Sequence, residues 1–319
     1  MRRVLRRGAP PAPGRFSLNR ASSLHGFINL APAPPWREYL LYVPRGFDAR
    51  SRPGLAVWIH GCRQDPEEFA AGTRIARFAD ERGFLVLLPR QTRMANSERC
   101  WNWFDRRTIG GAGEAAIVLA QAAEAMQKFN VDPRRVFVAG LSSGGTLAAT
   151  LALRAPQLFA AAALHSAVAA GAATDAADAA RAMDEGPRAG TDALALEARA
   201  RAGARARVPA LVIHGAADAT VTPVNSVFLV RQFLLLNGCL PAELPAGAAL
   251  PPGQVRAFQP RAAYLTSDYH AGRRLAARLV TIPGLGHAWS GGDAAYRFFD
   301  AGQLDATELV CDFFAAHSP

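Results

Sequence analysis

The sequence has little of what marks several large protein classes. Its 319 residues include only four cysteines and a single lysine, Lys128. The cysteines are too few for a scaffold built on disulfides, and they lack the spacing of zinc ligands. No uninterrupted apolar stretch approaches the roughly 20 residues of a membrane-spanning helix. These absences favour a globular protein, and we expect no membrane span, no metal and no cofactor.

The positive charge of the chain comes almost entirely from arginine. The formal net charge is +10, but the arginines are scattered through an alanine-rich sequence with no recognisable nucleic-acid-binding module. Aromatic residues are not interleaved with the basic ones, as they are in many nucleic-acid-binding surfaces. We therefore expect no nucleic-acid partner, although the charge favours acidic surfaces or polyanionic substrates. The oligomeric state is left open.

The first 35 residues differ in composition from the rest. They are rich in proline and arginine, and no acid precedes Glu38. They lack the continuous apolar core and small-residue cleavage site of a secretory signal. We predict a disordered tail over residues 1–35, with a mis-set start codon or a transit peptide as alternatives. No repeat or linker divides the remainder, so residues 36–319 are expected to form a single domain.

Within that domain, short apolar runs alternate with helical patterns. The runs show no polar alternation, which is typical of parallel strands buried on both faces, so an α/β fold with helices on both faces of a mostly parallel sheet is predicted. Residues 171–207 interrupt the alternation and favour a helical insertion over one end of the sheet, with a solvated loop as the alternative. The predicted strands are 37–44, 55–59, 84–88, 136–139, 159–164, 210–213 and 279–282, and the main predicted helices are 66–82, 114–129, 146–153, 223–236 and 305–316.

The stretch AGLSSGG at residues 139–145 joins a predicted strand to a predicted helix. A sharp turn of this kind strains the backbone of the central Ser142, and side chains two residues away would collide, so Gly140 and Gly144 fit there. The hydroxyl of Ser142 would then stand exposed at the tip of the turn. A simple Gly/Ser turn is the alternative reading.

A serine hydroxyl becomes a good nucleophile only beside a base, which in turn needs an orienting acid. His287 follows the last predicted strand on a glycine-flanked loop, and Asp218 follows the strand before it. The order Ser142, Asp218, His287 resembles that of the α/β-hydrolases. Asp218 could instead cap a turn near Pro223, and the weaker alternatives for the acid are Asp175 and Asp178.

Cleavage of an ester or amide by such a serine also needs two donors for the oxyanion. The amide of Ser143, directly after the candidate nucleophile, is one candidate. The amide of Cys62, in the turn after an early strand, is the other, although that turn could simply end the strand.

Five blocks of the sequence together resemble the poly(3-hydroxyalkanoate) depolymerase-type esterases, which are related to acetylxylan and feruloyl esterases. The resemblance covers roughly residues 36–316 and implies the α/β-hydrolase fold, with Ser142 as nucleophile, Asp218 as acid and His287 as base. It also implies that Cys62 and Cys100 lie close enough to form a disulfide, the alternative being two free thiols. The blocks are HGCRQDPEEFA at 60–70, CWNWF at 100–104, AGLSSGG at 139–145, HGAADATVTPVNS at 214–226 and GLGHAWSGG at 284–292.

The expected activity is therefore that of a serine esterase acting through an acyl-enzyme. Hydroxyalkanoate oligomers or polyesters and related short-chain esters are the expected substrates, with soluble molecules favoured because no separate polymer-binding module is recognised. Trp101, Trp103 and Trp289 are candidates to line the substrate groove, or else they fill the core. The resemblance suggests an extracellular protein, although no clear signal peptide is present. An acetylxylan or feruloyl esterase and a catalytically silent binding protein are the alternatives.

Overall fold

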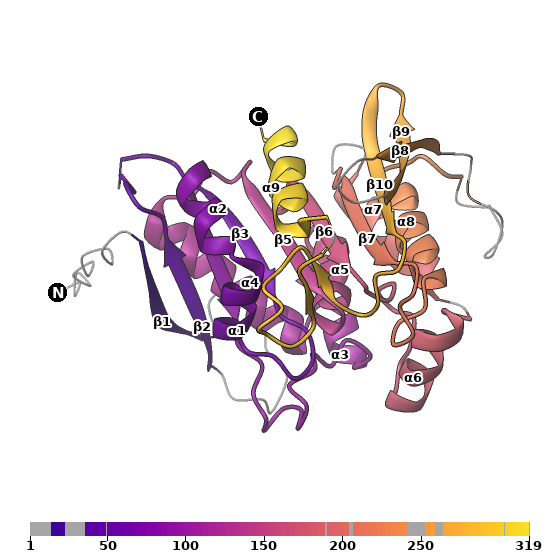
Figure 1. Ribbon diagram of the computed structural model, residues 1–319, viewed down its shortest axis with the longest axis horizontal. Helices are drawn as coiled ribbons and strands as arrows, with labels where there is room; N and C mark the ends of the chain where they lie inside the picture. Colours follow the sequence, from indigo (N-terminus) through magenta and orange to yellow (C-terminus); the bar gives the residue numbers. More distant parts are fainter. Residues whose placement is uncertain are drawn as a thin grey trace.

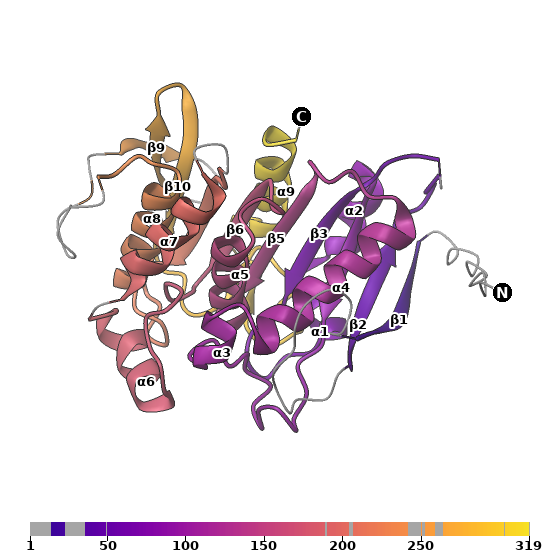
Figure 2. The same cartoon turned by 180° about the vertical axis from the view of Figure 1, so that it is seen from behind.

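A computed structural model describes residues 14–22, 36–48, 50–188, 190–203, 207–241, 250, 253–258, 264–302 and 304–318. Among these residues, ten strands form one twisted sheet with helices on both of its faces (Figures 1 and 2). No helix of this described part has the length and apolar character needed to cross a lipid bilayer.

The middle of the sheet is parallel and its two edges are antiparallel. From one edge to the other the strands run β1-β2-β4-β3-β5-β6-β7-β10-β9-β8, and the six from β4 to β10 in this order are parallel to one another. The carboxyl ends of β3, β5, β7 and β10 therefore meet at one edge of the sheet. The bounds are β1 Arg15–Ser22, β2 Trp36–Val43, β3 Gly54–Ile59, β4 Phe84–Pro89, β5 Val136–Leu141, β6 Ala161–His165, β7 Ala210–Gly215, β8 Gln254–Phe258, β9 Tyr264–Ala271 and β10 Arg274–Ile282.

The helices cover the sheet in two layers, which Figures 1 and 2 show from opposite sides. One face carries α4 (Gly113–Phe129), α5 (Ser143–Arg154), α7 (Thr191–Ala202) and α8 (Val224–Leu236). The other carries α1 (Pro66–Thr73), α2 (Ile75–Arg82) and α9 (Ala306–Ala316). The short α3 (Arg106–Ile109), α6 (Ala176–Glu185) and the two-residue strands β11 (Trp289–Ser290) and β12 (Phe299–Asp300) complete the described elements.

Two apolar cores, one on each face, explain why the strands lack polar alternation. In β3, Leu55 and Val57 pack into the core under α4 and α5, while Ala56 and Trp58 pack into the core under α1, α2 and α9. All four side chains are almost fully buried. The predicted parallel sheet with helices on both faces is therefore confirmed.

The structure differs from the sequence expectations in several segments. Part of the tail expected to be disordered forms β1, which pairs antiparallel with β2, whereas 1–13 and 23–35 lie outside the described residues. The helix predicted over 66–82 is two helices, because Arg74 adopts a left-handed φ of 54° and its side chain binds the Gly291 carbonyl and Asp305. The strand β8 forms over residues for which no strand was predicted, whereas the insertion at 171–207 contains α6 and α7, as favoured.

Candidate active site

Ser142 occupies a strained turn between β5 and α5. Its φ of 55° and ψ of −121° lie in a region that residues with a side chain rarely adopt. A Cβ on Gly140 would lie 2.4 Å from the Gly144 backbone, and one on Gly144 would lie 2.3 Å from the His60 carbonyl oxygen. Both positions therefore require glycine, for the reason that the sequence motif suggested. The turn presents the half-buried Ser142 hydroxyl at the carboxyl edge of the sheet.

Ser142, Asp218 and His287 come together at that edge. Asp218 follows β7 and His287 follows β10, and these two strands are parallel neighbours. His287 Nε2 lies 3.0 Å from Ser142 Oγ, and His287 Nδ1 lies 2.8 Å from Asp218 Oδ2. With its Nδ1 proton donated to the carboxylate, the ring presents Nε2 to the serine as an acceptor.

The surroundings of Asp218 keep it ionised. Its Oδ1 accepts hydrogen bonds from the amides of Thr220 (3.0 Å) and Val221 (2.9 Å). Burial raises the pKa of Asp218, but the hydrogen bond and charge interaction with His287, helped by the Val221 amide, hold that pKa below its ordinary value. His214 Nε2, 3.5 Å from Asp218 Oδ2, donates to the Val221 carbonyl at 2.9 Å. The carboxylate is therefore fixed in position and charged at neutral pH.

The amides of Ser143 and Cys62 are the two candidate oxyanion donors. Ser143 is the first residue of α5, so its amide has no acceptor one turn earlier in the helix. The Cys62 amide makes no hydrogen bond to another residue in the described part of the chain. The turn that contains Gly61 and Cys62 is stabilised by the Gln64 side chain. It accepts a hydrogen bond from the Gly61 amide at 2.9 Å and donates one to the Arg297 carbonyl at 3.1 Å. Cys62, Ser142 and Ser143 line the same cavity, as expected for the two donors.

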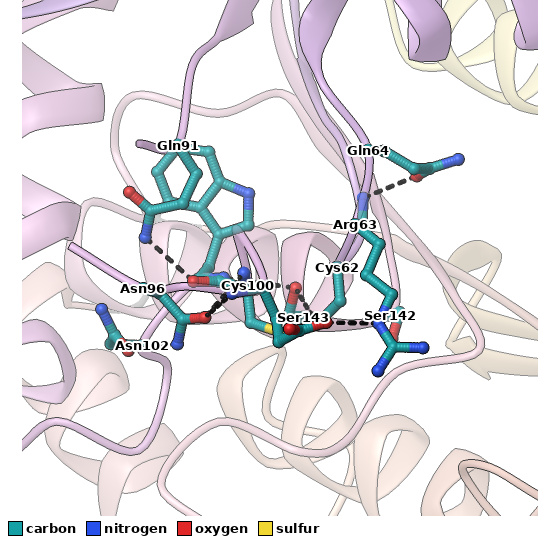
Figure 3. The surroundings of a disulfide bond; sticks show 12 residues. Cys62, Arg63, Gln64, Gln91, Asn96, Cys100, Asn102, Ser142 and Ser143 are labelled. Carbon is teal, nitrogen blue, oxygen red and sulfur yellow. Dashed lines mark hydrogen bonds and ion pairs between the residues drawn. A yellow bond between two sulfur atoms is a disulfide. The ribbon is translucent and has the colours of Figure 1, made fainter. Parts of the chain in front are cut away.

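Cys62 and Cys100 form a disulfide beside this turn, as the family resemblance implies (Figure 3). Their Cα atoms are 4.1 Å apart, and the two cysteines are 38 positions apart in the sequence. The Ser143 hydroxyl lies 3.4 Å from the Cys62 sulfur and accepts from the Trp101 amide at 3.3 Å. The bridge therefore joins the Cys62 turn to residues 100–104, which we call the tryptophan-rich loop, and the Ser143 hydroxyl links this loop to the start of α5.

A buried polar network that the sequence analysis missed supports the tryptophan-rich loop. Glu114, at the start of α4, accepts from the Asn102 amide (2.7 Å) and side chain (2.9 Å), and from Gln91. Gln91 in turn donates to the Cys100 carbonyl at 2.9 Å (Figure 3). Burial raises the pKa of Glu114, while the bonds from Gln91 and Asn102 act in the opposite direction. No local sequence pattern marks these residues, because their partners are distant in the chain.

Two buried histidines near the site stay neutral. Burial lowers the pKa of His60 to about 4 and that of His165 to about 3. His60 Nδ1 donates to the Gly61 carbonyl at 2.7 Å, and its Nε2 accepts from the Gln91 amide at 3.2 Å. They therefore act as structural hydrogen-bonding groups.

A cavity of about 300 Å³ opens in front of Ser142. Its apolar wall includes Trp103, Val168 and Met183, the last from α6 of the insertion. Of the three tryptophans proposed as substrate contacts, Trp103 lines this cavity. Trp101 is not among its lining residues; it is buried and donates to the His60 carbonyl at 3.0 Å.

The third of these tryptophans, Trp289, is buried in the other core, where it stacks on His165 and donates to Thr307 at 3.0 Å. Asp175, an alternative for the acid, is exposed and caps α6 by accepting from the Asp178 amide. Among the described residues, no group of three or more His, Cys, Asp or Glu side chains is arranged to hold a metal ion.

Comparison with solved structures identifies the fold. The chain superposes on an acetyl xylan esterase from Aspergillus awamori with a TM-score of 0.68 and 23% sequence identity, covering 85% of this chain and 94% of that one. The fold is that of the α/β-hydrolases, as the order of the three site residues suggested.

Comparison with curated sequences gives relatives that are named as esterases or as a polyester depolymerase. Poly(3-hydroxyalkanoate) depolymerase C of Paucimonas lemoignei is 31% identical over 216 residues, covering 66% of this chain and 51% of the relative. Feruloyl esterase B of Neurospora crassa is 31% identical over 150 residues, covering 46% and 50%. The chain thus spans about half the length of these relatives. The family model described as Esterase PHB depolymerase matches residues 37–255, more than half of the chain, so the chain belongs to the PHB depolymerase esterase family.

Proposed function

We propose that the protein is a serine esterase that hydrolyses carboxylic esters through an acyl-enzyme, with Ser142 as nucleophile, His287 as base and Asp218 as the orienting acid. One observation carries the proposal above the others. The chain of contacts from Asp218 Oδ2 through both nitrogens of His287 to Ser142 Oγ has lengths of 2.8 and 3.0 Å, and it ends at a serine held in a strained turn.

In the first half of the reaction, Ser142 Oγ bonds to the ester carbonyl carbon while its proton moves to His287 Nε2. The carbonyl oxygen becomes an anion, which the Cys62 and Ser143 amides stabilise. The tetrahedral intermediate then expels the alcohol, which takes the proton from His287. The acyl group remains bound to Ser142 through an ester bond.

In the second half, His287 removes a proton from a water molecule that attacks the acyl carbonyl. Collapse of the second intermediate breaks the bond to Ser142 Oγ, and the proton returns to that oxygen. The carboxylic acid leaves. Asp218 remains ionised throughout and stabilises the imidazolium that forms twice in each cycle.

Replacing Ser142 by alanine tests the assignment. The variant should lose turnover of p-nitrophenyl acetate and keep its far-UV circular dichroism and its unfolding midpoint, because the side chain is small and half-buried. Turnover at the wild-type rate in a variant verified by mass spectrometry would refute the role of Ser142. A fluorophosphonate probe that fails to label the wild-type protein would instead support the catalytically silent binding protein.

Two ester classes compete as substrates. Hydroxyalkanoate oligomers and short-chain esters are supported by the family and by a cavity of about 300 Å³, which is large enough for a small acyl group. Acetylated or feruloylated polysaccharide is supported by relatives named feruloyl and acetylxylan esterases at about 30% identity. Measuring kcat/KM on 3-hydroxybutyrate trimers, acetylated xylo-oligosaccharides and methyl ferulate under one set of conditions separates them.

A further inference from the structure

Beside the cavity at Ser142 lies a second one whose lining is dominated by arginine. It has a volume of about 240 Å³, and we call it the arginine cavity. Its side chains come from three loops, which follow β3, β4 and β11. Arg63 and Glu98 line both cavities, so the two are neighbours. The residues of the arginine cavity are Arg63, Arg93, Ser97, Glu98, Arg99 and Arg297.

The positive charge of this cavity is only partly balanced. Arg63 forms an ion pair with Glu98, and Arg99 Nη1 lies 3.0 Å from Asp65 Oδ2. Arg93 donates a long hydrogen bond of 3.5 Å to the Ser97 carbonyl. Within the described part of the chain, neither Arg93 nor Arg297 has a carboxylate at ion-pair distance. Two guanidinium groups thus remain to receive an anion, and guanidinium groups match carboxylates in geometry as well as charge.

We propose that the arginine cavity binds a carboxylate carried by the alcohol part of the ester that lies on Ser142. This proposal rests on the proposed esterase function and adds a substrate class to it. The bound molecule bridges the two cavities past Arg63, which follows the candidate oxyanion donor Cys62 and lines both cavities. Part of the excess positive charge of the chain thereby serves to bind a carboxylate in the arginine cavity.

The assignment to the alcohol side follows from the position of His287. This residue gives its proton to the leaving alcohol, so the alcohol lies next to its ring. Phe298 packs edge-on against that ring with centroids 6.4 Å apart, and Arg297 directly precedes Phe298. Gln64 also ties the Arg297 backbone to the turn that carries Cys62. The arginine cavity is therefore fixed relative to the reacting atoms.

The acyl side is provided by a different part of the wall. Trp103, Val168 and Val221 belong to one packed apolar cluster, with Met183 against it, and all four line the cavity at Ser142. An apolar acyl chain suits this cluster, and a charged group does not, because burying an unpaired charge there is costly. The apolar cluster thus receives the acyl chain, and the arginine cavity receives the carboxylate on the alcohol part.

Two kinds of ester carry a carboxylate on the alcohol side. A linear hydroxyacid oligomer ends in a free carboxylate next to its last ester bond, and an acylated polysaccharide can carry uronic acid substituents. In both cases the group that the arginines bind is a carboxylate. The experiment therefore includes both kinds, each with an uncharged counterpart.

The test measures kcat/KM of the purified protein on the 3-hydroxybutyrate trimer acid and on its methyl ester. The ratio of acid to methyl ester should be about ten at low salt and fall as salt is added, because exposed charges are screened. Arg93→Gln and Arg297→Gln should each lower the ratio about three-fold, and the double variant should bring it close to one. Glu98→Gln should raise it. The matched control, Arg273→Gln in the exposed turn between β9 and β10, should leave it unchanged.

A second pair of substrates identifies the source of the carboxylate. Acetylated xylo-oligosaccharides with and without a glucuronic acid substituent replace the trimer pair in the same assay. An arginine-dependent preference for the charged member of either pair supports the proposal. Ratios near one in both pairs, or ratios that survive in the double variant, overturn it.

A binding measurement separates this proposal from the esterase assignment. The trimer acid is titrated into Ser142→Ala by calorimetry, and the same titration is made with Ser142→Ala that also carries Arg93→Gln and Arg297→Gln. Binding that depends on the two arginines, together with a wild-type protein that turns over none of these esters, would refute the esterase function and keep the arginine cavity. Equal binding by both proteins would refute the arginine cavity alone.

Discussion

Replacing Asp218 by asparagine should inactivate the protein while leaving its fold nearly intact. An asparagine oxygen in the place of Oδ1 still accepts from the Thr220 and Val221 amides. Its NH₂ group then faces His287 Nδ1, 2.8 Å away, where the carboxylate accepted a hydrogen bond. Two donors cannot share that contact, so the imidazole must take the other tautomer and present a proton to Ser142.

The size of the effect follows from this change of tautomer. A histidine protonated on Nε2 cannot accept the Ser142 proton, and kcat should fall by about 10⁴-fold, or about 5.5 kcal/mol of barrier. The assay is kcat on p-nitrophenyl acetate at neutral pH, with the unfolding midpoint as a check on the fold. Asp175→Asn, at the exposed cap of α6, is the control and should stay within about two-fold of the wild type. A loss of less than about ten-fold in the folded Asp218→Asn variant would refute the role given to this carboxylate.

Three further predictions concern the surroundings of the site. Gly144→Ala places a Cβ 2.3 Å from the His60 carbonyl oxygen, and chemical denaturation should show a loss of about 1–3 kcal/mol or more; unchanged stability would contradict the packing argument. Reducing the Cys62–Cys100 bridge, which closes 38 residues, should lower the free energy of unfolding by about 3–4 kcal/mol and also lower kcat, whereas full kcat after reduction would show that the bridge does not position the Cys62 amide. Burial lowers the pKa of His60 to about 4 and that of His165 to about 3, so below about pH 6.5 the unfolded chain binds more protons than the folded one. The free energy of unfolding should therefore decrease as the pH falls from about 6.5 to about 4, by about 1.4 kcal/mol per pH unit for each histidine. Denaturation midpoints that do not change over this range would contradict that reasoning.

The central sheet could be predicted because each of its strands has a local signature. Apolar runs such as 55–59 and 136–139 are buried on both faces, so their composition alone distinguishes them from amphipathic strands. The turn at Ser142 was equally predictable, because the sterically required Gly140 and Gly144 lie only two residues from Ser142 in the sequence. Local steric and burial requirements leave local patterns.

The edge strands of the sheet and the hydrogen bonds around Glu114 were harder to predict, because they depend on partners that are distant in the sequence. β1 has its partners in β2, and β8 and β9 pair with each other beside β10, with no two-sided burial to mark them. The hydrogen bonds that Glu114 accepts from Gln91 and Asn102 form only in the folded chain, so no sequence pattern marks this residue.

The arginine cavity illustrates the same limit. The sequence shows an excess of arginine, but its concentration beside Ser142 depends on three loops that follow different strands. Charge patterning along the chain therefore could not reveal this site, and only the folded arrangement does.

Covalent labelling tests the central claim most directly. The protein is treated with a fluorophosphonate probe, digested, and its peptides are sequenced by mass spectrometry. We predict a single adduct on Ser142, lost in Ser142→Ala and strongly slowed in Asp218→Asn. An adduct on the neighbouring Ser143, or labelling of Ser142 that proceeds equally fast without the Asp218 carboxylate, would contradict the account.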